Sequence, residues 1–195
     1  MYYHTFLGKD ELFERIAKSF EPTLVTKIIS AYELAENAYI NKYRADKMPI
    51  FYHITRVCKI LLDELKLQEP DLIIASLLHD VFVSKTDINH SIISFNFGYY
   101  VTFLVDTLTD DSIDFKNSKF DGKSLFEVAG EDGLIIRLAE ILDEMRCIEY
   151  NTEILPIPYY TKVSKIYLSR IEKINNSSIQ YLADEIKKEG NRLLQ

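Results

Sequence analysis

Apolar residues recur at intervals of three and four along almost the whole chain, and this spacing constrains the fold more than any other feature. It places apolar side chains on one face of an α-helix. Convincing alternation of apolar and polar residues, which marks strands, is absent. The pattern predicts a compact all-α bundle, with helices in the segments around 10–20, 22–42, 54–66, 71–82, 98–108, 133–150 and 159–194.

Prolines and polar stretches punctuate this pattern. Pro22 and Pro70 suit the first turn of a helix, and Pro49 favours an extended backbone before the segment that follows it. The polar stretch 110–122 predicts a loop between two helices. A pause at 175–178 divides the last segment into two packed helices.

Length and composition limit the architecture. A chain of 195 residues with 47% hydrophobic content can build one sizeable core, so we expect a single domain spanning 1–195. No apolar run reaches the ~20 residues of a membrane span. The N-terminus lacks the basic start and apolar centre of a signal peptide. We therefore expect a cytoplasmic protein with no membrane partner. The sequence does not determine the oligomeric state.

Charge limits the class of ligand. A net charge of −7 and a pI of about 5.2 argue against long nucleic acid as a partner, because that binding depends on basic patches. A small phosphorylated ligand needs only a few cations or a metal ion. Cys58 and Cys147 lie in apolar helical patterns without CxxC spacing, so we expect buried thiols.

Two adjacent polar residues, His79 and Asp80, end a strongly apolar helical segment. Burying both without compensation costs several kcal/mol, so each needs a hydrogen bond, an ion pair or a cation. A buried His–Asp hydrogen bond would explain the pair by itself. His53, at the start of another apolar helix, would alone be a capping or core histidine.

A carboxylate, Glu140, lies within the apolar segment 134–142. A salt bridge to Arg137 or Arg146 is the simple explanation. A shared metal ion requires that Glu140 converge with the two histidines and Asp80.

From about 31 to 150, the order of these motifs resembles the hydrolase domain of RelA/SpoT-type alarmone enzymes and their small stand-alone relatives, a branch of the HD superfamily. Several short motifs in the same order are far more specific than one. The matching pieces are Tyr43-Arg44 with Pro49-Ile50-Phe51-Tyr52-His53, then Ala75-Ser76-Leu77-Leu78-His79-Asp80-Val81, then Phe97-Gly98 with Leu104-Val105-Asp106, and finally Leu138-Ala139-Glu140-Ile141-Leu142 with Met145-Arg146.

The resemblance implies a helical HD domain in which His53, His79, Asp80 and Glu140 hold one divalent metal ion, often manganese in this branch. Mixed imidazole and carboxylate ligands also suit iron and related ions. The implied function is metal-dependent hydrolysis of a nucleotide, for example one like (p)ppGpp, or of another small phosphoester. The helices in 159–194 follow the motif-bearing core.

The chain departs from the family where a catalytic acidic pair is expected. Val83 and Ser84 stand at those positions, and neither can act as a general base. Glu140 replaces the usual aspartate. Asp143 and Glu144, near Glu140 on its helix, are candidates for a relocated general base. Alternatively, both face solvent or pair with Arg146 and lysines.

Candidate substrate-binding residues follow from the same resemblance and from their charge or aromaticity. Arg44 matches a family position associated with the nucleotide base, and Lys47 lies nearby. Tyr52 is a candidate pocket wall, and Lys162 could reach a phosphate. Each also has an ordinary reading as a surface or core residue. A second hypothesis is a catalytically silent HD domain that serves as a nucleotide sensor or a protein-interaction module.

Overall fold

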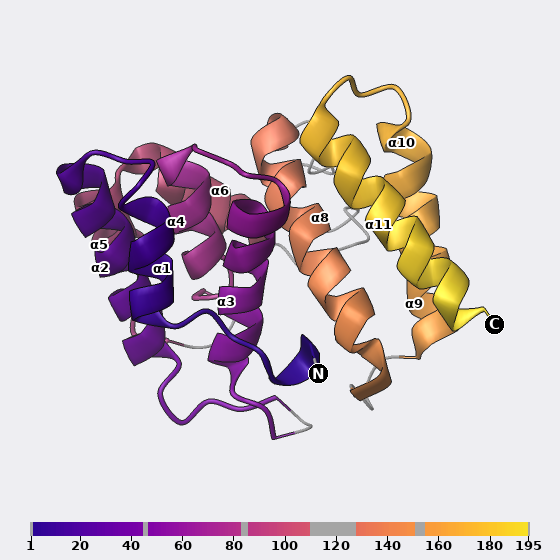
Figure 1. The fold of residues 1–195 in the computed structure, drawn as a ribbon, viewed down its shortest axis with the longest axis horizontal. Helices are drawn as coiled ribbons and strands as arrows, with labels where there is room; N and C mark the ends of the chain where they lie inside the picture. The colour runs from indigo at the N-terminus through magenta and orange to yellow at the C-terminus, as the bar shows by residue number, and fades with distance from the viewer. Residues whose placement is uncertain (1, 45–46, 83–85, 110–127, 151–154, 195) are drawn as a thin grey trace.

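The computed structural model describes residues 2–44, 47–82, 86–109, 128–150 and 155–194, and their regular structure is helical (Figure 1). These ranges contain no strand, only an isolated bridge between Tyr43 and Pro49. The predicted all-α bundle is therefore confirmed. Over the same ranges, no helix is both long and apolar enough to cross a membrane.

The N-terminal part of the chain forms one group of packed helices, on the left of Figure 1. Its members are α1 (Lys9–Ile16), α2 (Pro22–Ala38), α3 (Ile50–Lys59), α4 (Pro70–Leu78), α5 (His90–Phe97) and α6 (Tyr99–Leu108). Helix α4 contacts α2, α3 and α6. Pro22 and Pro70 occupy first turns, where a missing amide hydrogen costs no helical hydrogen bond.

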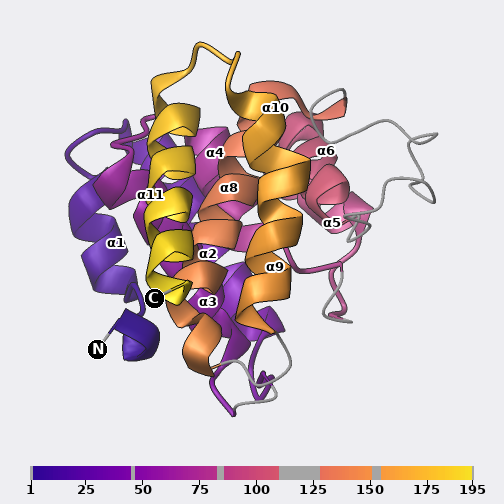
Figure 2. The same ribbon diagram turned by 90° about the vertical axis from the view of Figure 1, so that its right-hand side faces the viewer.

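Helix α8 (Gly130–Cys147) lies between this group and the C-terminal helices (Figures 1 and 2). Every residue in 133–143 is buried. A helix buried on all sides must pair its polar side chains inside the protein, because unpaired buried charges are very costly. Arg137, Glu140 and Asp143 all fall in this buried stretch, so the fold itself requires partners for them.

The C-terminal part adds α9 (Pro156–Val163), α10 (Ser169–Ile171) and α11 (Ser177–Leu193). Helix α11 packs along α8 and against α9. Asn176 begins α11 by accepting hydrogen bonds from the backbone amides of Ser178 and Ile179. One hydrophobic cluster runs through both parts of the chain, from Leu7 to Ile186.

Three features differ from the predicted pattern or lie beyond it. Helix α3 begins at Ile50, earlier than the predicted segment 54–66, and continues into a π-helical turn, η2 (Ile60–Glu64). Helix α5 was not predicted. The predicted loop 110–122 lies outside the described residues.

Candidate metal centre

His53 is placed by the first part of α3. Its side chain is buried, and its Nδ1–H donates a hydrogen bond to Asp143 Oδ2 at 2.7 Å. A proton on Nδ1 leaves the lone pair on Nε2, which is the form of imidazole that binds a metal. The carboxylate of Asp143, on α8, therefore fixes the tautomer in which His53 Nε2 could bind a metal ion.

His79 directly follows the last residue of α4. Its Nδ1–H donates to the backbone carbonyl of Ser76 at 2.7 Å, which again leaves the lone pair on Nε2. That Nε2 atom is fully buried and has no hydrogen-bond partner among the described residues; Asp80 Oδ1 lies 3.8 Å from it. A buried polar atom without a partner costs about 1–3 kcal/mol, so this nitrogen fits the role of a metal ligand.

Asp80 completes a cluster with the two histidines. One potential ligand atom from each of His53, His79 and Asp80 lies within 4.8 Å of the others. Burial raises the pKa of Asp80, but the neighbouring His79, His53, Arg137 and Arg44 outweigh it and hold this pKa below its ordinary value. Two imidazoles and an ionised carboxylate fit a divalent transition-metal ion.

Glu140 is not part of this three-residue cluster. Its carboxylate accepts two hydrogen bonds from Arg137 Nη1, at 2.9 and 2.7 Å, which is one of the two salt bridges considered from the sequence. Burial raises the pKa of Glu140 to about 8, against the opposing charge of Arg137 and with the support of Asp80 and Glu144. The charge of Glu140 thus interacts with that of Asp80 in the cluster, whereas its hydrogen bonds come from Arg137.

Asp143 and Glu144 occupy different environments on α8. Asp143 is fully buried and binds His53 and the guanidinium of Arg56, whose Nε lies 2.7 Å from Oδ1. Burial raises the pKa of Asp143, but the hydrogen bonds from His53 and Arg56 outweigh it and hold the pKa well below the ordinary range. This geometry suits an orienting carboxylate. Glu144 is half-buried and accepts a hydrogen bond from the Tyr159 hydroxyl.

The four candidate substrate-binding residues lie on three parts of the chain: the loop before α3, α3 itself and α9. Arg44 lies close enough to Asp80 to lower its pKa. Lys47 is exposed in the same loop, where its positive φ of 68° forms the turn. The half-buried Tyr52 stacks on Phe6, with ring centroids 4.6 Å apart. Lys162 is exposed on α9.

One arginine near the cluster, Arg56, was not identified from the sequence. Arg56 lies one turn after His53, on α3, and is 2% exposed. Its position beside the apolar residues Ile54, Val57 and Cys58 was a usable signal, because a buried guanidinium requires a carboxylate partner. Arg137 was considered only as a partner of Glu140. Val83 and Ser84, the positions at which an acidic pair was expected from the resemblance, lie outside the described residues.

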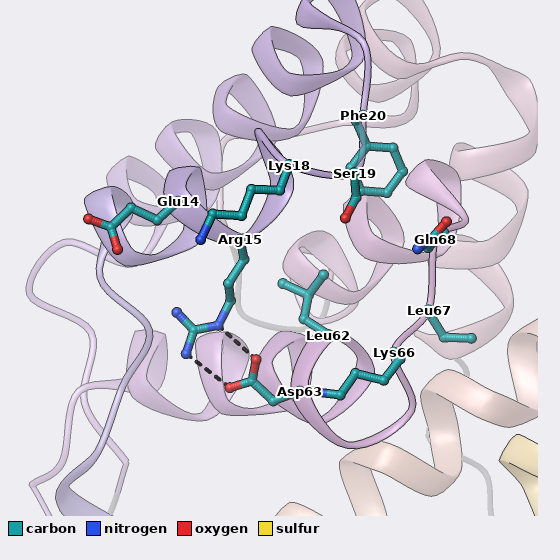
Figure 3. Close-up of a pocket in the computed structure, with 10 residues that line it drawn as sticks. All are labelled: Glu14, Arg15, Lys18, Ser19, Phe20, Leu62, Asp63, Lys66, Leu67 and Gln68. Carbon is teal, nitrogen blue, oxygen red and sulfur yellow. Dashed lines mark hydrogen bonds and ion pairs between the residues drawn. The ribbon is translucent and has the colours of Figure 1, made fainter.

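A separate pocket of about 390 Å³ lies between the end of α1 and η2 (Figure 3). Figure 3 shows Arg15 pointing toward Asp63, and two hydrogen bonds of 2.7 and 3.0 Å join them. The pocket is lined by no histidine and by no member of the cluster. The candidate metal centre is therefore distinct from this pocket.

Comparison with known proteins supports the fold. No family model matches the sequence, and no curated protein matches it. A solved structure of a metazoan ortholog of SpoT, described as hydrolysing ppGpp and as having a role in starvation responses, superposes with a TM-score of 0.65. The match covers 87% of this chain and 97% of the ortholog, at 24% identity. The two chains share one fold. This agrees with the fold expected from the order of the sequence motifs.

Proposed function

We propose that the protein is a metal-dependent phosphohydrolase that acts on a nucleotide or another small phosphoester, with a (p)ppGpp-like molecule as the first candidate. The observation that carries the proposal is the cluster of His53, His79 and Asp80, in which the buried Nε2 of His79 accepts no hydrogen bond from any described residue. The shared fold with a ppGpp-hydrolysing SpoT ortholog supports the choice of substrate class.

In this proposal His53, His79 and Asp80 hold a divalent ion, with Mn(II) as the expected metal. When bound, such an ion supplies Lewis acidity toward a phosphoryl oxygen and lowers the pKa of a water molecule. Glu140 is the proposed fourth ligand, because its carboxylate interacts electrostatically with Asp80 and His53. Arg137 fixes that carboxylate in place beside the cluster.

The remaining candidates have separate proposed tasks. Asp143 orients His53, since both of its oxygens already accept hydrogen bonds from protein donors. Glu144 is the proposed general base because it is only half-buried and so retains access to water. Arg44 binds a phosphate near Asp80. Lys47 and Lys162 add positive charge, and Tyr52 forms a wall of the ligand site.

The second candidate function is a catalytically silent nucleotide sensor. Val83 and Ser84 favour it, because they stand where the resembling hydrolases carry an acidic pair. The hydrogen bonding of Asp143 also favours the sensor, because the two carboxylate oxygens already accept hydrogen bonds from Arg56 and His53.

Release of phosphate or pyrophosphate from a panel of nucleotides that includes ppGpp separates the two functions. The assay is run with Mn²⁺ and with a chelator, on the wild type, His79→Ala, Asp80→Ala and the control His90→Ala. His90 is exposed and bound to Asp106, so this control removes an imidazole that is not a member of the cluster.

We expect turnover that needs Mn²⁺, survives His90→Ala and falls to background in the two cluster variants. Turnover that persists in the presence of a chelator would contradict the metal-dependent mechanism. Mn²⁺ binding and nucleotide binding without product would instead identify the sensor.

A further inference from the structure

The first residues of the described chain are anchored against the groups that support His53. The short turn η1 (Tyr2–His4) contacts α8, and Figure 1 shows it between α3 and the C-terminal half of α8. Arg56 Nη1 donates to the backbone carbonyl of Tyr3 at 2.9 Å. The Tyr2 hydroxyl donates to Asp143 Oδ1 at 2.8 Å.

The carboxylate of Asp143 is held by three side chains. Oδ1 accepts hydrogen bonds from Tyr2 and from Arg56 Nε, and Oδ2 accepts from Arg56 Nη2 and His53 Nδ1. Four donors on two oxygens leave this group little freedom to rotate or shift. Because His53 is one of the donors, any movement of the carboxylate also moves the imidazole.

We propose that Tyr2 is a positioning residue for the metal cluster, acting through Asp143 to fix the ring and the tautomer of His53. Groups that bind the far nitrogen of a metal-binding imidazole set its orientation, and their loss typically weakens metal binding. Tyr2 acts one hydrogen bond further away. The inference rests on the metal-binding part of the proposed function and does not require hydrolysis.

The Tyr2 hydroxyl can be removed without removing its ring. The guanidinium carbons of Arg146 and Arg56 lie 5.4 and 5.7 Å from the centre of this ring. These cation–π contacts remain in Tyr2→Phe. The substitution therefore removes the interactions of the hydroxyl, with Asp143 and with Arg146, and keeps the packing of the N-terminal turn.

A matched control is available on the same helix. The Tyr100 hydroxyl donates to Asp132, which lies in the first turn of α8, about 16 Å along the helix from Asp143. Tyr100→Phe thus also deletes a hydroxyl bound to a carboxylate of α8, but at a distance from His53.

The first test is calorimetric titration of the metal-free proteins with Mn²⁺ alone. We expect Tyr2→Phe to weaken Mn²⁺ binding about tenfold, the lower end of the range for groups that support a ligand, while Tyr100→Phe binds as the wild type does. Equal affinity in Tyr2→Phe and wild type would overturn the proposal, and so would a wild type that binds no Mn²⁺.

The second test needs no metal. Nitrogen-15 NMR of the His53 imidazole should show a proton on Nδ1 in the wild type and in Tyr100→Phe, and a mixture of tautomers in Tyr2→Phe. An unchanged tautomer in Tyr2→Phe would sink the positioning role. Mn²⁺ binding that depends on Tyr2 but produces no hydrolysis would refute only the hydrolase, whereas hydrolysis with binding independent of Tyr2 would refute only this inference.

Discussion

Arg56 and Asp143 form an ion pair from which water is excluded, with side chains 2% and 0% exposed. Such a pair gains little net stability over apolar residues, but removing one partner leaves the other charged and buried. Arg56 can compensate only partly, through the backbone carbonyls of Tyr3 and Thr5. The pair therefore makes the stability of the protein sensitive to the charge of a single carboxylate.

We expect Asp143→Asn to lower the free energy of unfolding at pH 7 by about 3–5 kcal/mol. The folded-state pKa of Asp143 lies below its unfolded value, so its contribution is present above about pH 4 and is lost as pH falls further. Urea unfolding between pH 7 and pH 3 measures both effects. The control is Asp184→Asn, because Asp184 forms an exposed ion pair with Lys187. An equal loss of unfolding free energy in both variants would contradict the prediction.

For Glu140 we expect the opposite dependence of stability on pH. Its pKa of about 8 in the folded protein lies above the ordinary value, so the protonated carboxyl is favoured on folding. The resulting stability is complete below about pH 4 and is lost as pH rises to about 8. In metal-free protein, Glu140→Gln should remove this decline in urea unfolding between pH 5 and pH 9. A decline that persists in Glu140→Gln, or disappears equally in the exposed Glu149→Gln, would exclude Glu140 as its source.

Single residues were predictable where they interrupt an apolar pattern. His53, His79 and Asp80 stand out in this way, and the spacing of Arg137 and Glu140 already suggested their pairing. The partner of Arg56 was not predictable, because Asp143 lies 87 positions away and the pairing depends on how α3 meets α8. The metal roles assigned to these residues remain predictions.

Helices α5 and α6 meet at Gly98, which is the element-scale feature with the clearest backbone requirement. Gly98 has φ 96° and ψ 166°, a conformation that is essentially restricted to glycine. A Cβ atom at this position would meet no other atom within 4 Å, so only the backbone opposes a larger residue. The corner between the two helices therefore depends on this glycine.

We expect Gly98→Ala to destabilise the protein by about 1–3 kcal/mol through backbone strain. Gly8→Ala is the matched control, because Gly8 also has open space around it but has an ordinary φ of −72°. Chemical denaturation of both variants provides the measurement. If Gly98→Ala loses no more stability than Gly8→Ala, the corner between the helices tolerates an alanine.

Helix positions were largely readable from apolar spacing, but the boundaries depended on local details. Helix α5 was missed although Asn89 caps it by accepting a hydrogen bond from the amide of Ile92, a recognisable helix start. The predicted segment 54–66 was shifted because α3 starts directly after Pro49 and ends in a π-helical turn. Periodicity does not report such a turn.

At the scale of the whole molecule, the candidate metal centre joins α3 and the end of α4, and α8 supports it through Asp143. An ion that binds only the assembled site stabilises the folded state by mass action, by about 2.7 kcal/mol when its concentration is one hundred times Kd. We expect thermal unfolding in one cooperative transition, consistent with the proposed single domain, with a Tm that rises with Mn²⁺. His79→Ala should abolish this rise and His90→Ala should retain it, as measured by scanning calorimetry. A Tm that does not respond to Mn²⁺ would argue against the site.

The hydrogen bond between Tyr2 and Asp143 joins residues 141 positions apart. During synthesis Tyr2 leaves the ribosome before its acceptor, which belongs to a helix made much later. Since domains begin to fold as the chain emerges, the N-terminal turn must wait for α8 before it can dock.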